Sequence, residues 1–159
     1  MSEFAGPRAR PKTAARRSFA FKDLFNASPV DRVSVIKAGV SARNLKQFVR
    51  ELDVDQKVMF EALNLKTATV NRKAAKSQPL SIEDSERVVG LAKLVGQLEA
   101  MIDESGDATG FNAIQWLSTW LREPLPALGG GRPIDLLDTM EGQAIVARVL
   151  AQIQSGAYA

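Results

Sequence analysis

Apolar side chains recur at helical spacing along this chain, and no segment alternates apolar and polar residues over a useful length. An amphipathic α-helix needs apolar residues near positions i, i+3, i+4 and i+7, whereas a half-buried strand needs strict alternation. The clearest stripe with the helical spacing consists of Leu45, Phe48, Val49 and Leu52. A longer one runs from Val88 to Ile102. The pattern predicts an all-α fold.

Capping residues indicate where the helices begin and end. Ser28, Ser41 and Ser81 each stand just before a periodic segment, and serine is a favoured N-cap. Gly39 and Asn64 tolerate a left-handed backbone, so they predict a helix end and a tight turn. Thr139 is a reasonable N-cap for the last helix. Pro133 can begin a short turn before it. The apolar residues between Phe19 and Phe25 predict a short strand or turn that seals onto the body.

The positive charge of the chain is concentrated at its beginning. Residues 1–22 hold six cations against Glu3 alone, and the whole chain has a net charge of +3, so the remainder is slightly acidic. Residues 1–20 are also rich in charge and lack periodicity, which predicts a disordered basic arm. The acidic and glycine-containing stretch 103–107 predicts the next boundary. We therefore expect an arm (1–20), a first helical domain (21–105) and a second one with a C-terminal tail (106–159).

The amino-acid composition argues against several classes of function. Cysteine and histidine are both absent, which removes disulfides, thiolate metal sites and the commonest general base. We therefore predict no enzymatic activity, no metal and no cofactor. No apolar run approaches the length needed to cross a bilayer, and the N-terminus has no apolar signal region. A cytoplasmic protein without membrane association is expected.

Two short segments, 55–65 and 66–76, have the proportions of a helix-turn-helix. The second segment contains four cations and no acidic residue, which suits DNA, where basic side chains neutralise phosphate and polar ones reach base edges. The alternative is a helical hairpin with a solvated basic face, and the sequence leaves both open. The candidate DNA-binding residues are Lys66, Thr67, Thr69, Asn71, Arg72, Lys73 and Lys76.

The C-terminal third contains both tryptophans and an aromatic residue next to the chain end. Trp116 and Trp120 are four residues apart, so they share a helix face. A small domain can hardly bury two indoles, so at least one is expected to face a partner, although which one stays open. Tyr158, between two alanines, could thread into a partner's pocket or simply belong to a frayed tail.

Several spaced residues in this third resemble a known family. Trp120-Leu-Arg-Glu-Pro124, Ala127-Leu-Gly-Gly130, Arg132-Pro-Ile-Asp-Leu-Leu137 and Gly142 are similar to the C-terminal toxin-binding domain of Xre-type antitoxins from RES–Xre toxin–antitoxin pairs. Upstream, 62–73 and 80–87 resemble the Cro-like helix-turn-helix of the same family and the long helix that follows it. Phe60 departs from the pattern, because helix-turn-helix proteins generally keep a small side chain there. This leaves open whether the two helices meet at the usual angle.

The resemblance implies a Cro-like helix-turn-helix body followed by a small helical toxin-binding domain. It implies an antitoxin that binds and neutralises a RES-domain toxin, an enzyme that destroys NAD. It further implies a homodimer that binds its own operator DNA as an autorepressor, and a C-terminal tail that occludes the toxin's active site. By position, the toxin-binding residues are Trp120, Leu121, Arg132, Tyr158 and Ala159.

Two alternatives to this function remain at this stage. One is a stand-alone helix-turn-helix transcriptional regulator whose C-terminal domain only dimerises. The other is an enzyme working with carboxylates such as Glu123 and Asp135, which the lack of histidine makes remote. Neither the operator sequence nor the ratio of toxin to antitoxin follows from the sequence.

Overall fold

The computed structural model describes residues 21–106 and 109–155, and within these ranges it contains helices and no strand. This confirms the predicted all-α fold. The α-helices are α2 (Phe21–Asn26), α3 (Pro29–Ala38), α4 (Ala42–Leu52), α5 (Gln56–Ala62), α6 (Thr67–Ala75), α7 (Ile82–Ser105), α8 (Ala113–Leu121) and α9 (Met140–Ser155). Two short 3-10 helices, η1 (Pro126–Leu128) and η2 (Pro133–Leu136), lie between α8 and α9. The predicted basic arm (1–20) lies outside the described residues.

The predicted caps are present and make the expected hydrogen bonds. Each capping serine hydroxyl accepts a hydrogen bond from the amide three residues later, which satisfies one of the free donors at a helix start. The pairs are Ser28 with Asp31 (3.1 Å), Ser41 with Asn44 (3.2 Å) and Ser81 with Asp84 (3.1 Å). Thr139 likewise accepts from the amide of Gly142 at 2.9 Å. Gly39 and Asn64 have φ angles of 89° and 57°, so the predicted helix end and turn are also confirmed.

The expectation of a strand or turn near Phe25 was wrong, because Phe21–Asn26 forms helix α2. Two kinds of contact from outside the segment favour the helix: it packs against α7, and Arg32 bonds its last carbonyls. The Arg32 guanidinium donates to the carbonyls of Leu24 (3.0 Å), Phe25 (3.3 Å) and Ala27 (2.5 Å). A cation that bonds the last carbonyls stabilises a helix end. No local capping signal announces this arrangement in the sequence.

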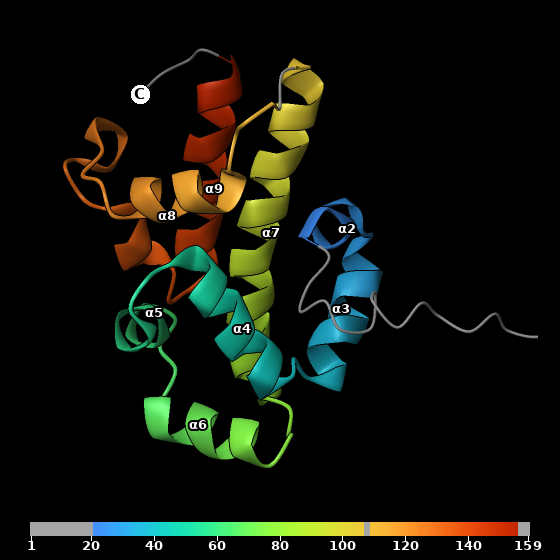
Figure 1. Cartoon of the computed structure of the whole chain (residues 1–159). Coiled ribbons are helices and arrows are strands. Elements are labelled where there is room, and N and C mark those ends of the chain that lie inside the picture. Colours follow the sequence, from blue (N-terminus) through green and yellow to red (C-terminus); the bar gives the residue numbers. More distant parts are fainter. Residues whose placement is uncertain (1–20, 107–108, 156–159) are drawn as a thin grey trace, which may run out of the picture.

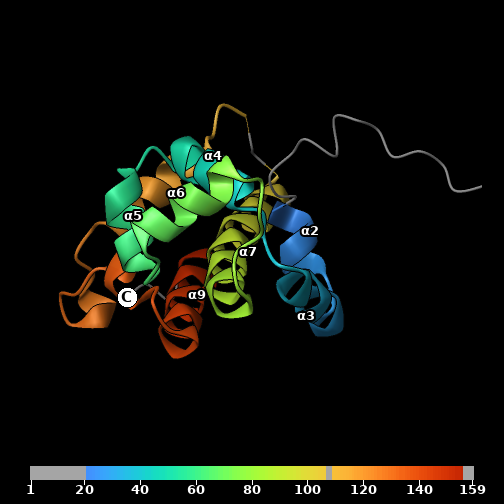
Figure 2. The ribbon, with the colours of Figure 1, turned by 90° about the horizontal axis from the view of Figure 1, so that it is seen from below.

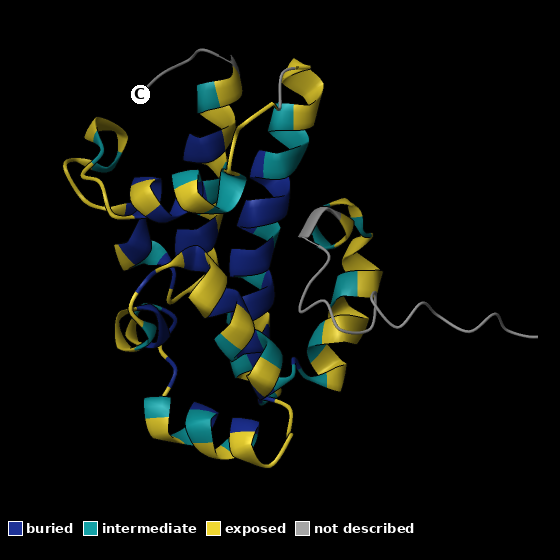
Figure 3. Cartoon of the chain, in the orientation of Figure 1, coloured by how far each residue is buried: buried dark blue, intermediate teal, exposed yellow. Residues whose placement is uncertain are grey.

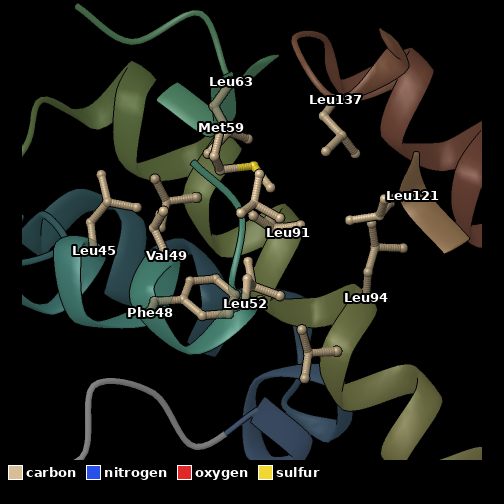
Figure 4. Packing of buried hydrophobic residues seen from close by; sticks show 14 of the residues in the cluster. Leu45, Phe48, Val49, Leu52, Met59, Leu63, Leu91, Leu94, Leu121 and Leu137 are labelled. Carbon is tan, nitrogen blue, oxygen red and sulfur yellow. The ribbon is translucent and has the colours of Figure 1, made fainter. Parts of the chain in front are cut away.

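Helix α7 is the centre of the molecule, and the other helices surround it (Figure 1). Its inward side chains belong to a single apolar cluster that includes residues of α4, α5, α8, η2 and α9. Figure 4 shows this meeting point, with Phe48 and Leu52 of α4 near Leu91 and Leu94 of α7. The predicted stripe on α4 is fully buried there. Figure 3 shows the same division, with buried residues along α7 and exposed ones outside.

The two ends of helix α7 have different neighbours. Helix α6 lies next to the beginning of α7, whereas the end of α9 lies next to the end of α7 (Figure 1). A hydrogen bond of 2.7 Å from Gln154 to Glu104 joins the ends of α9 and α7. Seen from below, α5 and α6 lie on the near side of the molecule (Figure 2). The basic helix α6 and the C-terminal helix α9 therefore reach opposite ends of one core (Figure 1).

Helices α7 and α9 approach closely at Gly90. A Cβ atom at Gly90 would overlap the side-chain oxygen of Gln143 on α9. The same Gln143 side chain donates to the carbonyls of Arg87 (3.0 Å) and Leu137 (2.9 Å), and it is 6% exposed. Since a buried polar group must keep its hydrogen bonds, Gln143 cannot move aside without cost. Gly90 is therefore required by packing rather than by its backbone conformation.

We expect Gly90→Ala to destabilise the protein, although alanine is the better helix former. Overpacking of this kind lowers the free energy of unfolding by about 1–3 kcal/mol. In a Gln143→Ala background the obstacle is gone, so Gly90→Ala becomes neutral or stabilises by up to about 1 kcal/mol. Urea denaturation of the four proteins of this double-mutant cycle measures the coupling. A stabilising Gly90→Ala in the otherwise unchanged chain would contradict the packing argument.

Candidate nucleic-acid and protein interfaces

Helices α5 and α6 are joined by a four-residue turn and form a helix-turn-helix. The turn is closed by backbone hydrogen bonds from Leu63 to Met59 (3.0 Å), from Asn64 to Glu61 (3.0 Å) and from Leu65 to Phe60 (2.8 Å). The bulky Phe60 side chain is completely buried in the common core. A large side chain at this position is thus accommodated by the core, and both helices of the motif still form.

The predicted DNA-binding residues lie together on α6 and at its two ends. Val70 and Ala74 are buried and anchor the helix to the body, so the other faces point outward. Lys66, Arg72 and Lys76 are exposed. The half-buried members of the predicted set are Thr67, Thr69, Asn71 and Lys73. The structure therefore places the basic and polar side chains around those sides of α6 that do not pack on the body.

Asn71 differs from the other predicted residues. Its side-chain oxygen is buried and has no hydrogen-bond partner within the described part of the chain. A bidentate contact with adenine needs both the oxygen and the nitrogen of an asparagine side chain. In this conformation Asn71 cannot make that contact.

Arg43 is a basic residue near α6 that the sequence patterns do not reveal. It lies on α4, and its Nε donates to the carbonyl of Ala74 at 2.9 Å. The side chain is exposed and therefore adds a positive charge beside the end of α6. Arg43 is 31 residues from Ala74 in sequence. Only the packing of α4 against α6 brings the two together, so the local sequence contains no signal for it.

Trp120 and Trp116 of α8, together with Phe111 just before that helix, form a row of aromatic rings that runs from the core to the surface. The rings of Trp116 and Trp120 are 5.8 Å apart and nearly parallel, and Phe111 lies 6.5 Å from Trp116. Trp120 is only 5% exposed, Trp116 is half-buried and Phe111 is 42% exposed. The open question is thus answered: Trp120 belongs to the core and Trp116 is available at the surface.

The predicted toxin-binding residues are consequently not all accessible. Trp120 and Leu121 are core residues, so their role in this structure is to hold α8 in place. Arg132 is exposed and forms two hydrogen bonds with Asp135, at 3.1 and 3.0 Å. These bonds and the negative charge of Asp135 raise the pKa of Arg132 above its usual range. Tyr158 and Ala159 lie outside the described residues.

The glycine-rich segment before Arg132 is a closed loop. Leu125 donates to Gly131 at 3.0 Å, and Gly130 donates back to Leu125 at 2.9 Å. Gly129 and Gly130 have positive φ angles, which explains the glycines as turn residues. Beside this loop, Arg122 and Arg132 line a shallow depression of about 340 Å³ whose opposite wall includes Val58 and Glu61 of α5.

The described residues contain no group of three or more potential ligands that could hold a metal ion. None of the helices in 21–106 and 109–155 has the length and apolar character needed to cross a membrane.

Comparison with known proteins identifies both parts of the chain. Residues 31–93 match the family described as the antitoxin Xre-like helix-turn-helix domain. Residues 110–156 match the antitoxin Xre/MbcA/ParS C-terminal toxin-binding domain. The first match includes most of α3, all of α4 to α6 and the first half of α7, and the second includes α8, both 3-10 helices and α9.

Two relatives extend this result. A protein of Sphingobium sp. (strain YBL2) named "Prs ADP-ribosylating antitoxin" is 67% identical over 159 residues, which is 100% of both chains. A protein of Pseudomonas putida named "Antitoxin Xre" is 28% identical over 88 residues, 55% of this chain and 50% of the relative. With a full-length relative at this identity and a match to each domain, the chain belongs to the Xre-type antitoxins, whose helix-turn-helix domain precedes a toxin-binding domain.

Proposed function

We propose that this antitoxin neutralises a RES-domain toxin by occluding its active site with the C-terminal tail, and that it represses its own operon as a DNA-binding homodimer. The observation that carries the proposal is the separation of two surfaces on one core. The basic helix α6 lies at one end, and α8 and the last turn of α9 lie toward the other (Figure 1). One chain can then hold toxin and DNA at the same time, in the cytoplasm, without performing chemistry itself.

The chemistry of the toxin is inferred from the name of the full-length relative. That relative is called an ADP-ribosylating antitoxin, and transfer of ADP-ribose to a protein consumes NAD. This agrees with the NAD-consuming activity expected of a RES-domain toxin. A toxin that uses NAD must bind it, and a C-terminal segment of the antitoxin inserted at that binding site would exclude NAD.

The most direct test is co-expression with the neighbouring gene. If the product of that gene arrests growth alone, and growth returns when this chain is present, the pair is a toxin and its antitoxin. The intact mass of the co-purified complex then gives the stoichiometry. Growth arrest that this chain does not relieve would favour a regulator that acts on DNA alone.

Phe111 and Trp116, the aromatic residues that reach the surface, should contribute most of the affinity for the toxin. Aromatic side chains are enriched among the few interface residues that dominate binding, each costing about 2 kcal/mol or more when truncated. Trp116→Ala is therefore expected to raise the dissociation rate of the toxin complex by a factor of about 30. Surface plasmon resonance with purified toxin measures this rate. Gln115→Ala, an exposed neighbour on the same helix, is the matched control and should bind normally.

The tail should be needed for inhibition more than for binding. Deleting Ala157, Tyr158 and Ala159 should leave the complex intact, because α8 and α9 are unchanged, but should restore NAD consumption by the bound toxin. An NAD-consumption assay on the purified complex, beside its melting temperature, separates the two effects. Complete inhibition by the shortened chain would exclude the tail as the occluding segment.

The basic face of α6 should bind phosphate. Replacing Arg72 and Lys73 by alanine should weaken DNA binding and flatten its dependence on salt, by about one unit of slope for each phosphate that is no longer neutralised. Fluorescence anisotropy with a labelled duplex from upstream of the gene, at several salt concentrations, measures both quantities. Arg148→Ala removes an exposed charge from α9 and serves as the control. An unchanged slope would mean that α6 does not face phosphate.

A further inference from the structure

One arginine of α7 joins the long central helix to the turn of the helix-turn-helix. The Nε of Arg87 donates to the carbonyl of Leu63 at 2.6 Å, and its Nη2 donates to the carbonyl of Asn64 at 3.3 Å. The same Nη2 bonds Asp84 at 2.6 Å. One planar guanidinium thus bridges two consecutive turn carbonyls and a carboxylate. A lysine ammonium has no comparable fork of donors.

The two carbonyls lie at a point where the chain needs an external partner. Leu63 and Asn64 follow the last residue of α5, so their carbonyls extend the negative end of that helix. Asn64 also has a left-handed backbone with φ of 57°, which asparagine tolerates better than most residues with a side chain but which is still less favourable than the right-handed one. A cation fixed against both carbonyls stabilises this conformation.

Helix α6 depends on this turn more than the other helices depend on their own starts. In α3, α4, α5, α7 and α8 a side chain of the N-cap residue bonds an amide of the first turn. The N-cap residue of α6 is Lys66, which makes no such bond. The buried anchors of α6 are only Val70 and Ala74. The start of α6 therefore relies on the turn that Arg87 holds, whereas its end is held by Arg43 of α4.

Arg87 is poorly suited to be a phosphate-binding residue itself. Its side chain is only 17% exposed, and its ion pair with Asp84 balances its charge. The backbone carbonyl of Arg87 also accepts a hydrogen bond from the side chain of Gln143, which belongs to the toxin-binding domain. The backbone that carries Arg87 is thus held from both sides, as a rigid support requires.

We propose that Arg87 is a positioning residue for DNA recognition: through the carbonyls of Leu63 and Asn64 it fixes the orientation in which α6 meets the base edges. The inference rests on the proposed DNA-binding function. It distinguishes two roles for cations in this domain, because those of α6 neutralise phosphate whereas Arg87 acts through the backbone. Loss of Arg87 should then reduce recognition of sequence while leaving the electrostatic part of binding in place.

The test compares the unchanged full-length chain with Arg87→Gln, Arg87→Lys and Asp84→Asn. Anisotropy titrations use a duplex from upstream of the gene and a scrambled duplex of equal length, each at several salt concentrations. For Arg87→Gln we expect affinity for the upstream duplex to fall about tenfold or more, as for removal of a specific base interaction. Affinity for the scrambled duplex and the salt slope should stay unchanged. Arg87→Lys keeps the charge but should recover only part of the affinity.

Further readouts separate positioning from general destabilisation. Toxin binding and the melting temperature are measured for each variant, and binding is compared only where the protein is folded. Asp84→Asn keeps Arg87 but frees its guanidinium, so it should give a smaller loss of the same kind. Arg148→Gln makes the same change of residue type on α9 and should bind both duplexes normally.

Each other outcome overturns a definite claim. If Arg87→Gln lowers the salt slope by about one unit, Arg87 contacts phosphate directly and is not a positioning residue. If both duplexes are bound as tightly as by the unchanged chain, the turn does not need Arg87. If Arg87→Lys restores full recognition, charge rather than the bridging geometry is what matters. If the unchanged chain binds neither duplex, the DNA-binding function itself fails and this proposal with it.

Discussion

The burial of α7 is the constraint on which the rest of the structure depends. Helices α6 and α8 have nine residues each, and isolated helices of that length are unstable in water. Each is stable here because it places a few apolar side chains into a cluster that includes α7. The DNA-binding motif and the toxin-binding domain therefore share one core, although they are separate families in sequence. A substitution at the centre of α7 should therefore affect the stability of both the helix-turn-helix and the toxin-binding domain.

Buried polar side chains along α7 fix how the neighbouring helices are set against it. Apolar contacts alone are non-directional and would tolerate small displacements. Ser85 accepts a hydrogen bond from the Val40 amide at 2.8 Å, and Gln97 donates to the carbonyl of Ala147 at 2.9 Å. Gln143 adds a third link, from α9 back to α7. Each link is specific in position, so together they select one arrangement of α3, α7 and α9.

The two candidate interfaces differ in the physical basis of binding. On α6, exposed cations and threonines suit a polyanion, whose binding is governed by charge and by salt. At and just before α8, Trp116 and Phe111 offer aromatic surface of the kind that protein partners bind, where desolvation dominates. A chain with no histidine and no cysteine can perform both tasks, because neither requires chemistry. This is consistent with an antitoxin, which acts by occupying surfaces.

Local sequence signals were sufficient for the described α-helices other than α2 and for the location of the helix-turn-helix. Capping serines, the apolar stripes and the turn residue Asn64 act over four or five residues, and the structure agrees with each of them. The accessibility of the predicted toxin-binding residues was less predictable, since two tryptophans four residues apart can lie either in the core or at the surface. Only the packing of α8 shows that Trp120 is buried and Trp116 accessible.

Contacts between distant residues were decided by the tertiary structure alone. Helix α2 packs on α7 and has its last carbonyls bonded by Arg32, and the end of α6 gains Arg43 because α4 packs against it. The contact between Arg87 and the turn joins residues more than twenty positions apart. Sequence by itself determined the helical pattern, the basic segment and the family, since these depend on local spacing and on ordered motifs. Which side chains meet, and which remain exposed, depends on how the helices pack around α7.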